Sequence, residues 1–343
     1  MSKALIIRFS AIGDVAMTIP VIYSVAKANP ADTFTVLTQA FLAPLFVNRP
    51  PNVSILEMDK NTKRNLFFTY LRYVLALRKH KFDIVLDLHM VIRTWLIDVL
   101  FAIYGKRVFK LEKGRKEKKR LTARPPKIIF PLPSMTARYE DVFRRAGFRT
   151  EQTFVSLYDT LLPDVQKTED IAGKKEGFWI GIAPFAKHRG KIYPIEQMEK
   201  VVKALTEQQP VKIFLFGAHG EEEAVFSRWE TICPNIKNMA GKCTLDKELI
   251  LMSQLDLLVS MDSANMHFAS LVGTPVISIW GATHPFAGFY GYHQNPGLII
   301  QKNLSCRPCS IFGNKPCYRG DWACMEMDSG IIVEKVKKFF SIQ

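Results

Sequence analysis

The stretch that decides the fold is residues 254–285, QLDLLVSMDSANMHFASLVGTPVISIWGATHP. Two largely apolar runs with β-branched residues, 255–261 and 276–280, predict strands that are covered on both faces, as in a parallel sheet. Residues 263–272 between them are long enough for roughly two to three turns of helix. Gly273 and Pro275 predict the end of that helix and the entry into the next strand.

Polar side chains follow both of these predicted strands. Asp262 and Ser263 stand between the first strand and the helix, and Thr283 follows the second strand in a loop of small residues. An open α/β sheet binds ligands at this edge, where the first N–H groups of a helix attract anions. Ala264 lets a ligand come close, and His267 lies one turn further on. We expect a phosphate or diphosphate here; the alternative is that Asp262 and Ser263 are ordinary helix caps.

Composition and charge narrow the class of protein. The chain has 343 residues, 48% hydrophobic and 23% charged, which is typical of a globular protein with room for two domains. No apolar run reaches the length of a membrane span, and Arg8 interrupts an N-terminal apolar run too short for a signal peptide. We therefore expect a cytoplasmic protein. Its formal net charge of +15 indicates an anionic partner, whether nucleic acid, an acidic membrane surface or an acidic ligand.

The first predicted strand, residues 3–9, also delivers polar residues to the edge of a sheet. A tight turn follows it, and residues 15–29 predict a helix despite Pro20. Gly13 would let a substrate approach the backbone, and Asp14 is either a helix cap or a general base. The turn has no G-x-G-x-x-G pattern, so the fingerprint of a dinucleotide site is missing.

Strands and helices alternate along both halves of the chain, which predicts an α/β fold with doubly wound parallel sheets. His89 and Arg93 fall at the carboxyl end of one predicted strand, at the same edge as Asp14. The remaining predicted strands are residues 33–38, 53–58, 83–88, 178–183 and 211–216. The remaining predicted helices are residues 39–47, 62–79, 92–104, 138–146, 195–208 and 221–233.

The most biased segment is residues 106–127, with eleven Lys and Arg against Glu112 and Glu117, a local charge of +9. Such a run is either a mobile, solvated loop or a surface that holds an anionic acceptor or an acidic membrane. No aromatic-interleaved basic pattern accompanies it, so we do not expect nucleic acid as a partner.

Four of the six cysteines lie close together near the C-terminus, in the pattern C-x2-C-x7-C-x6-C. A close pair followed by two more cysteines can form a tetrahedral zinc site, whereas disulfides are not expected in the cytosol. The alternative is a group of unliganded thiols, and neither interpretation suggests a catalytic role. The four residues are Cys306, Cys309, Cys317 and Cys324.

Six motifs stand in one order from about residue 4 to residue 325: IIRFSAIGDVAMTIP, FDIVLDLHMVIRT, IGIAPFAKHRGKIYP, LFGAHGEEE, NMAGKCTL and VSMDSANMHFASLVGTPVISIWGATHP. In this order and spacing they resemble the heptosyltransferases of bacterial lipopolysaccharide synthesis, glycosyltransferase family 9. The resemblance implies a GT-B fold, in which two Rossmann-like domains face a cleft. It places an acceptor domain at residues 1–160, a linker at 161–177, a nucleotide-sugar domain at 178–328, and a C-terminal helix at 329–343 that can pack back on the first domain.

The resemblance also assigns roles to single residues. Asp14 matches the general base, and Lys191 matches the lysine that neutralises donor phosphate. The remaining donor-site matches are Glu221 near the ribose, Asp262, Ser263, Ala264 and His267 in the motif D-[ST]-[GA]-x-x-H, and Thr283 in the second phosphate loop. On the acceptor side we expect Gly13, His89 and Arg93. Lys60, Lys63 and Arg64 could meet an acidic sugar such as Kdo, but we favour the alternative that each is solvated surface.

The implied reaction is inverting transfer of heptose from ADP-heptose to an anionic lipopolysaccharide core or similar glycolipid. A lysine and a helix N-terminus can stabilise the departing diphosphate, so no cofactor is required. The implied location is the cytoplasm, peripheral on the inner face of the membrane. The alternatives are a nucleotide-sugar-binding relative without transfer activity, or a transferase that uses another nucleotide sugar. The chain departs from the family where Tyr193 replaces a common tryptophan and His89 a common glutamine.

Overall fold

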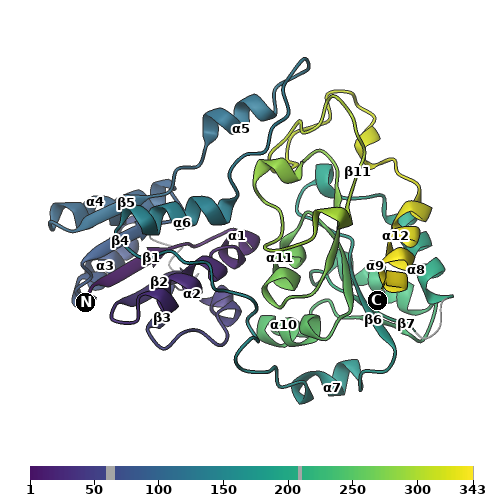
Figure 1. The fold of residues 1–343 in the computed structure, drawn as a ribbon, viewed down its shortest axis with the longest axis horizontal. Coiled ribbons are helices and arrows are strands. Elements are labelled where there is room, and N and C mark those ends of the chain that lie inside the picture. Colours follow the sequence, from purple (N-terminus) through teal and green to yellow (C-terminus); the bar gives the residue numbers. More distant parts are fainter. Residues whose placement is uncertain (59–65, 208–210, 343) are drawn as a thin grey trace. The chain divides into compact units, whose positions relative to one another are not determined.

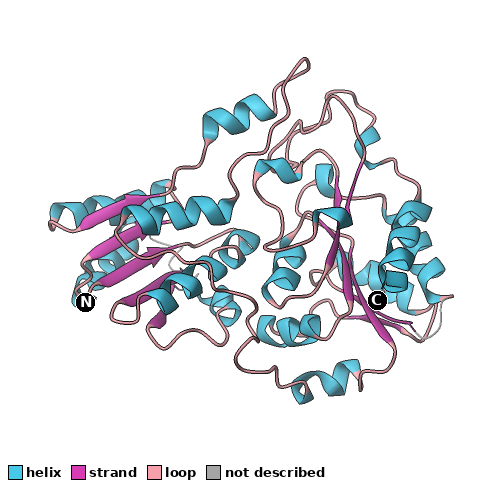
Figure 2. Ribbon diagram, in the orientation of Figure 1, coloured by secondary structure: helices cyan, strands magenta, loops and turns pink. Residues whose placement is uncertain are grey.

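The computed structural model describes residues 1–58, 66–207 and 211–342; residues 59–65, 208–210 and 343 lie outside the described part. Lys60, Lys63 and Arg64 therefore lie outside it too. The chain forms two compact units, the first comprising Met1–Lys113 and Met135–Asp159 and the second Gly114–Ser134 and Thr160–Gln343. Both units have a parallel sheet between layers of helices (Figures 1 and 2).

Unit 1 is built on a five-stranded parallel sheet in the order β3-β2-β1-β4-β5. The central strand β1 is buried on both faces because Ala4, Leu5, Ile6 and Ile7 are apolar without interruption. The strands are β1 (Lys3–Ile7), β2 (Thr33–Gln39), β3 (Val53–Met58), β4 (Ile84–Asp87) and β5 (Arg107–Lys110).

Helices cover both faces of this sheet. One face packs against α3 (Leu66–Leu77) and α4 (Ile92–Ile103), where Leu5 and Ile7 meet Val74 and Phe101 in a single core. On the other side, the ring of Phe34 on β2 lies 6.3 Å from the ring of Phe143 on α6 (Met135–Arg145). Helix α2 (Ile19–Ala28) packs against α6.

The helix expected at residues 15–29 is two helices, α1 (Ile12–Ala16) and α2 (Ile19–Ala28). Pro20 explains the break, because its ring has no N–H and would clash with a carbonyl one turn earlier in a continuous helix. The helix expected at residues 39–47 is a 3-10 helix, η1 (Ala40–Leu45), which contains Pro44. In both places a proline inside an apolar helical pattern prevents one continuous α-helix.

Unit 2 is built on a six-stranded parallel sheet in the order β11-β10-β9-β6-β7-β8. The strands are β6 (Phe178–Ala183), β7 (Val211–Leu215), β8 (Ile236–Asn238), β9 (Leu257–Met261), β10 (Val276–Trp280) and β11 (Ile299–Gln301). The helices are α5 (Arg115–Leu121), α7 (Gln166–Ala172), α8 (Ile195–Thr206), α9 (Glu221–Glu230), α10 (Leu245–Ser253), α11 (Ala264–Leu271) and α12 (Ser329–Ile342).

Two segments at the predicted domain boundaries have structure within unit 2. The segment expected to be a linker contains α7, which packs on α10; there Gln254 Nε2 donates a 3.0 Å hydrogen bond to Thr168 Oγ1. The C-terminal helix α12 buries Ile332, Val333 and Val336 in the core of unit 2, and its packing on the first domain stays a prediction. In this core, α12 packs against α8.

The basic run of residues 106–127 is not an irregular solvated loop. It begins with strand β5, where the adjacent pair Val108 and Phe109 lies between two basic residues, and it continues into helix α5. Lys127 then donates hydrogen bonds to the carbonyl oxygens of Cys306 and Pro308. Leu121 is buried in a small apolar cluster of unit 2. The run therefore spans parts of two folded units.

Candidate functional site

Three neighbouring strands of unit 2, β6, β9 and β10, end at the same edge of the sheet. The loop after β6 contains the 3-10 turn η4 (Arg189–Lys191), the loop after β9 contains Asp262 and Ser263, and the loop after β10 contains Thr283. The parallel register of the three strands therefore brings together residues that are more than 90 positions apart in the chain.

The centre of this edge is an ion pair between Lys191 and Asp262. Lys191 Nζ lies 2.9 Å from Asp262 Oδ2, and their side chains are 16% and 4% exposed. Because little water screens them, each charge holds the other in one place. The pair brings a lysine from the β6 loop to the N-terminal side of helix α11.

Among the described residues, no side chain of the cap residue forms a capping hydrogen bond with the N-terminus of α11. Ser263 occupies the cap position in extended backbone, but its hydroxyl makes no capping hydrogen bond and lies 3.3 Å from Ser260 Oγ instead. The carboxylate of Asp262 is engaged by Lys191. The first N–H groups of the helix therefore keep their capacity for an anion, which argues against the alternative of simple caps.

The other residues expected at this edge are also close to it in the fold. Ala264 is the first residue of α11, and His267 is buried within the same helix. Thr283 is fully buried, and its hydroxyl has no hydrogen-bond partner among the described residues. A small residue at position 264 leaves the helix N-terminus accessible, and a hydroxyl with spare capacity suits a polar ligand atom.

The loops after β6 and β10 are joined through their backbones. Ala282 N donates to Gly190 O at 2.8 Å, and Gly190 N donates to Gly313 O at 3.2 Å. A Cβ atom on Gly190 would lie 2.7 Å from Gly313 O and 3.0 Å from the Ala282 side chain. Glycine is required here because the backbones approach too closely for any side chain.

Arg307 fixes the position of the Thr283 loop, and the sequence did not single it out. The side chain is buried and donates to the carbonyl oxygens of Gly281, Lys302 and Thr283, the last at 2.9 Å, and to Gln301 Oε1 at 3.0 Å. Burial lowers the pKa of its guanidinium to about 10, so it stays charged at neutral pH. Arg307 lies between Cys306 and Cys309, in a segment whose sequence pattern is defined by its cysteines.

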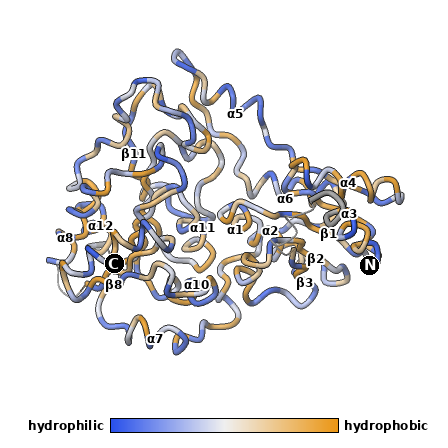
Figure 3. The backbone as a smooth tube through the Cα atoms, turned by 180° about the vertical axis from the view of Figure 1, so that it is seen from behind, coloured by the Kyte–Doolittle hydropathy of each residue, from blue (hydrophilic) through white to orange (hydrophobic). Residues whose placement is uncertain are grey.

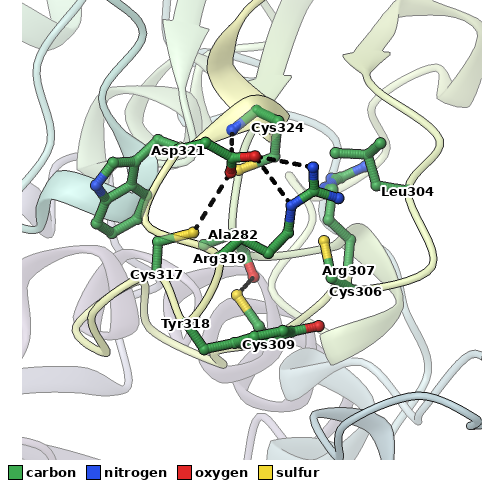
Figure 4. Close-up of a pocket in the computed structure, with 12 residues that line it drawn as sticks. Ala282, Leu304, Cys306, Arg307, Cys309, Cys317, Tyr318, Arg319, Asp321 and Cys324 are labelled. Carbon is green, nitrogen blue, oxygen red and sulfur yellow. Dashed lines mark hydrogen bonds and ion pairs between the residues drawn. The ribbon is translucent and has the colours of Figure 1, made fainter.

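The four clustered cysteines line one pocket of unit 2 together with Arg307 and the exposed pair Arg319 and Asp321 (Figure 4). All four are free thiols. Burial raises the pKa of Cys309, and that of Cys324 to about 11, which favours the protonated thiol. In this arrangement no three Cys, His, Asp or Glu side chains of the described residues are placed to hold a metal ion. Of the two alternatives, this arrangement is that of unliganded thiols, and zinc at these cysteines stays a prediction.

Glu221, expected near a donor ribose, is the first residue of α9 and is exposed. Its neighbours hold the turn that follows β7: Glu222 accepts a hydrogen bond from Ala218 N at 2.7 Å, and Glu223 lies 2.6 Å from His219 Nδ1. The turn is thus organised by side chains of the same helix, while the carboxylate of Glu221 is left toward solvent.

The carboxyl edge of the unit 1 sheet carries a second charged group. Arg8 Nη2 lies 2.7 Å from Asp14 Oδ2, and Arg8 Nη1 donates to Leu88 O at 2.6 Å. Asp14 also accepts a 3.2 Å hydrogen bond from Ala11 N, and its side chain is 21% exposed. Arg8 therefore orients a carboxylate that solvent still reaches. No sequence pattern pointed to Arg8 beyond its position in an apolar run.

His89 lies beside this group and is neutral at physiological pH. Its Nε2 is 3.3 Å from Ser10 Oγ, and its ring meets Phe9 edge to face at 5.7 Å between centroids. Burial and then the charge of Arg8 lower its pKa to about 3. Asp87 shapes the turn by accepting hydrogen bonds from the backbone N–H of His89 and of Met90 at 2.7 and 2.8 Å.

Gly13 and Arg93 flank the same edge of unit 1. Gly13 lies in helix α1, directly before Asp14, and Arg93 is exposed in the first turn of α4. Two doubly wound sheets in one chain, one with an anion-binding edge and one with an oriented carboxylate, are the architecture of a GT-B glycosyltransferase.

Comparison with known proteins gives the family. The profile of glycosyltransferase family 9 (heptosyltransferase) matches residues 70–315, and the chain belongs to this family. A curated relative, lipopolysaccharide heptosyltransferase 3 of Escherichia coli, is 24% identical over 280 residues, which cover 79% of this chain and 81% of that protein.

Two solved structures share the fold. The ADP-heptose lps heptosyltransferase II of Escherichia coli has a TM-score of 0.72 at 17% identity, with 98% of each chain covered. The heptosyltransferase WaaC of Escherichia coli, solved with ADP-2-deoxy-2-fluoro heptose, has a TM-score of 0.68 at 16% identity, with 98% of this chain and 99% of that chain covered.

Proposed function

We propose that this glycosyltransferase moves heptose from ADP-heptose to an anionic lipopolysaccharide core or a similar glycolipid, with inversion at the sugar. The observation that carries the proposal is the uncapped N-terminus of α11 with Lys191 held beside it by Asp262. That arrangement suits the diphosphate of a nucleotide sugar. Support for the donor comes from the solved relative that holds ADP-2-deoxy-2-fluoro heptose.

In the donor site, Lys191 and the N–H groups of α11 receive the negative charge that develops on the departing diphosphate. Ala264 leaves room at the helix end, and Thr283 offers its hydroxyl to a phosphate oxygen. His267 and Glu221 are the further donor contacts, with Glu221 toward the ribose. Because these groups meet the diphosphate charge, the proposed reaction requires no metal ion.

At the acceptor side, Asp14 acts as the general base. The acceptor oxygen attacks the anomeric carbon while its proton passes to Asp14, the bond from that carbon to the diphosphate oxygen breaks, and ADP leaves with the electron pair. The 2.7 Å ion pair with Arg8 orients the carboxylate. Gly13, His89 and Arg93 are the proposed acceptor contacts, in a domain of residues 1–160.

The proposed setting of the reaction is the cytoplasmic face of the inner membrane, with the protein bound peripherally. Within the described residues, no helix is both long and apolar enough to span a bilayer. A lipid-linked anionic acceptor would suit a chain with a formal net charge of +15.

Calorimetric titration with ADP, UDP, GDP and CMP, each with and without EDTA, tests the donor. We expect ADP to bind most tightly and EDTA to have no effect. Tighter binding of UDP or GDP would keep the transferase class and discard heptose, and no binding of any nucleotide would contradict the proposed donor site.

Transfer to a lipopolysaccharide acceptor, followed in wild type and Asp14→Asn, tests the base. The substitution keeps the size of the side chain and should lower kcat by about 100-fold or more while ADP still binds. A wild-type protein that binds ADP-heptose but transfers nothing would favour the binding relative without activity. Full turnover by Asp14→Asn would exclude Asp14 as the base.

A further inference from the structure

Helix α4 of unit 1 has an apolar face on each side. Ile97 and Phe101 are buried in the core against the sheet. On the opposite side Ile92 is 90% exposed, Trp95 59% and Ile103 72%. At 100° per residue these three side chains fall within an arc of roughly 100°. Figure 3 shows the apolar colouring that runs along α4.

The exposed face is continuous rather than a set of isolated residues. Leu96 and Val99 lie between the three exposed side chains on the helix surface and are half-buried. Helix α3 packs beside α4 and adds Leu75, which is 40% exposed. A single exposed leucine or isoleucine needs no explanation, but a stripe along a whole helix marks a surface that meets a partner.

The charges around this stripe are basic. Arg93 is exposed on the first turn of α4, Arg107 is exposed on the adjoining strand β5, and the guanidinium of Arg78 lies 4.0 Å above the Tyr104 ring at the other end of the helix. The acidic residue of α4, Asp98, is buried and paired with Lys110 at 3.2 Å. An apolar stripe with a basic margin and a tryptophan is the pattern of a helix that lies in a membrane interface.

We propose that α4 is the membrane-docking element of this chain, and that Ile92, Trp95 and Ile103 insert at the headgroup and acyl boundary of an anionic bilayer. A second copy of the chain is a poorer occupant. A two-fold dimer through this face would bring the basic margins of both copies together, and like charges at an interface are unfavourable.

Docking through α4 would also bring a lipid-borne acceptor to the carboxyl edge of the unit 1 sheet. The helix begins at Ile92, three residues after His89, and His89 lies 3.3 Å from Ser10, next to the Arg8–Asp14 pair. This step rests on the proposed function. The docking itself does not, because it follows from the exposed face and its charges.

Flotation with vesicles that contain phosphatidylcholine and phosphatidylglycerol but no lipopolysaccharide tests the docking apart from transfer. We expect wild type to float with the vesicles, and the double variant Ile92→Ser/Ile103→Ser to partition at least tenfold more weakly. The matched control is Leu162→Ser, because Leu162 of unit 2 is 84% exposed and should matter little. Equal unfolding temperatures and ADP affinities would show that the variants are folded.

Fluorescence quenching by brominated lipids tests the depth of Trp95. Trp179, Trp229 and Trp280 are fully buried, and Trp322 of unit 2 is half-buried, so the difference between wild type and Trp95→Phe isolates the quenching of Trp95. Wild type should be quenched, and Trp95→Phe should float almost as well but lose most of the quenching. Wild type that fails to float, or a double variant that floats equally well, would overturn the proposal. So would a wild-type dimer that becomes monomeric in the double variant.

Discussion

Lys191 can have two roles, since it neutralises the buried carboxylate of Asp262 and can also face an anion. Asp262 is almost fully buried, so its carboxylate depends on Lys191 at 2.9 Å for compensation. Lys191 is more exposed than its partner and can still face an anion. Removal of Lys191 would therefore weaken a phosphate site and leave a buried charge unpaired at the same time.

We predict that Lys191→Met weakens ADP binding by about 1.5–3 kcal/mol, because a charged hydrogen-bond donor to phosphate is lost. Calorimetry measures this change. Lys187→Met is the matched control, since Lys187 lies exposed in the same loop. The double variant Lys191→Met/Asp262→Asn should recover thermal stability but not ADP affinity. An unchanged affinity in the single variant would exclude Lys191 from the donor site.

His89 supports a prediction about pH. In the unfolded chain a histidine titrates near pH 6.5, whereas burial and Arg8 lower the pKa of His89 in the fold to about 3. Between these values the unfolded state binds the proton and the native state does not. The native state should therefore lose stability as pH falls from about 6.5 toward 3, by at most about 1.4 kcal/mol per pH unit.

Thermal unfolding of wild type and His89→Gln between pH 7.5 and 4.5 checks this prediction. Glutamine cannot titrate, so the stability of wild type relative to the variant should fall steadily below pH 6.5. Comparison of the two proteins cancels the other groups that titrate in this range, such as His284, whose pKa burial lowers to about 4. A constant difference across the range would contradict a buried neutral His89.

At the scale of elements, the segment that contains Arg307 and the four cysteines has little regular structure. Between β11 and α12 the only helical turn in this described stretch is η7 (Ala323–Met325). Arg307 ties the segment to the loop after β10 through the carbonyl oxygens of Gly281 and Thr283. It also donates to Lys302 O and Gln301 Oε1 at the end of β11. The donor edge thus depends on a residue that touches no expected ligand.

We predict that Arg307→Met lowers the free energy of unfolding by about 2–4 kcal/mol, since buried carbonyl oxygens lose their donors. Urea denaturation measures the loss, and ADP affinity should fall with it because the Thr283 loop is no longer fixed. Arg319→Met is the control in the same segment, because Arg319 pairs with Asp321 at the surface and should change stability little. Equal stability of the two variants would refute the role of Arg307.

The elements that are buried on both faces could be predicted best from the sequence. Residues 178–183 and 276–280 form β6 and β10 with the expected bounds, because uninterrupted apolar runs have few alternatives to a central strand. Residues 53–58 also form the expected strand, β3, although it lies at the edge of its sheet and is only partly buried. Strand β5 was missed because its basic residues hid the apolar pair Val108 and Phe109. Helix α7 was missed because its polar surface resembles a linker.

The meeting of Lys191, Asp262 and Thr283 at one sheet edge could be predicted because they follow strands, and the ends of parallel strands meet. The arginine side chains that hold the loops and carboxylates at the sheet edges could not be predicted. Arg8 and Arg307 belong to no spacing pattern, and each acts through contacts with residues that are distant in the chain or through backbone carbonyls. Cysteine spacing leaves zinc and unliganded thiols as alternatives for a similar reason, because spacing does not fix the directions of the thiols.

At the scale of the whole molecule, the excess of positive charge is the main feature not used by either sheet edge. Much of it is displayed by α5, where Arg115, Lys116, Lys119 and Arg120 are exposed while Leu121 anchors the helix in unit 2. Long-range attraction of such charges to an anionic surface falls as salt screens them, whereas apolar insertion does not. Salt therefore separates the two contributions to membrane binding.

We predict that replacing Arg115, Lys116, Lys119 and Arg120 by Gln, which lowers the net charge from +15 to +11, weakens binding to anionic vesicles several-fold at low salt. The effect should vanish at about 0.5 M salt, where the Debye length is only a few ångströms. The Ile92→Ser/Ile103→Ser variant should keep its defect at high salt, because that defect is apolar. Flotation across a salt series measures both. An equal loss on neutral vesicles would show that α5 acts through something other than charge.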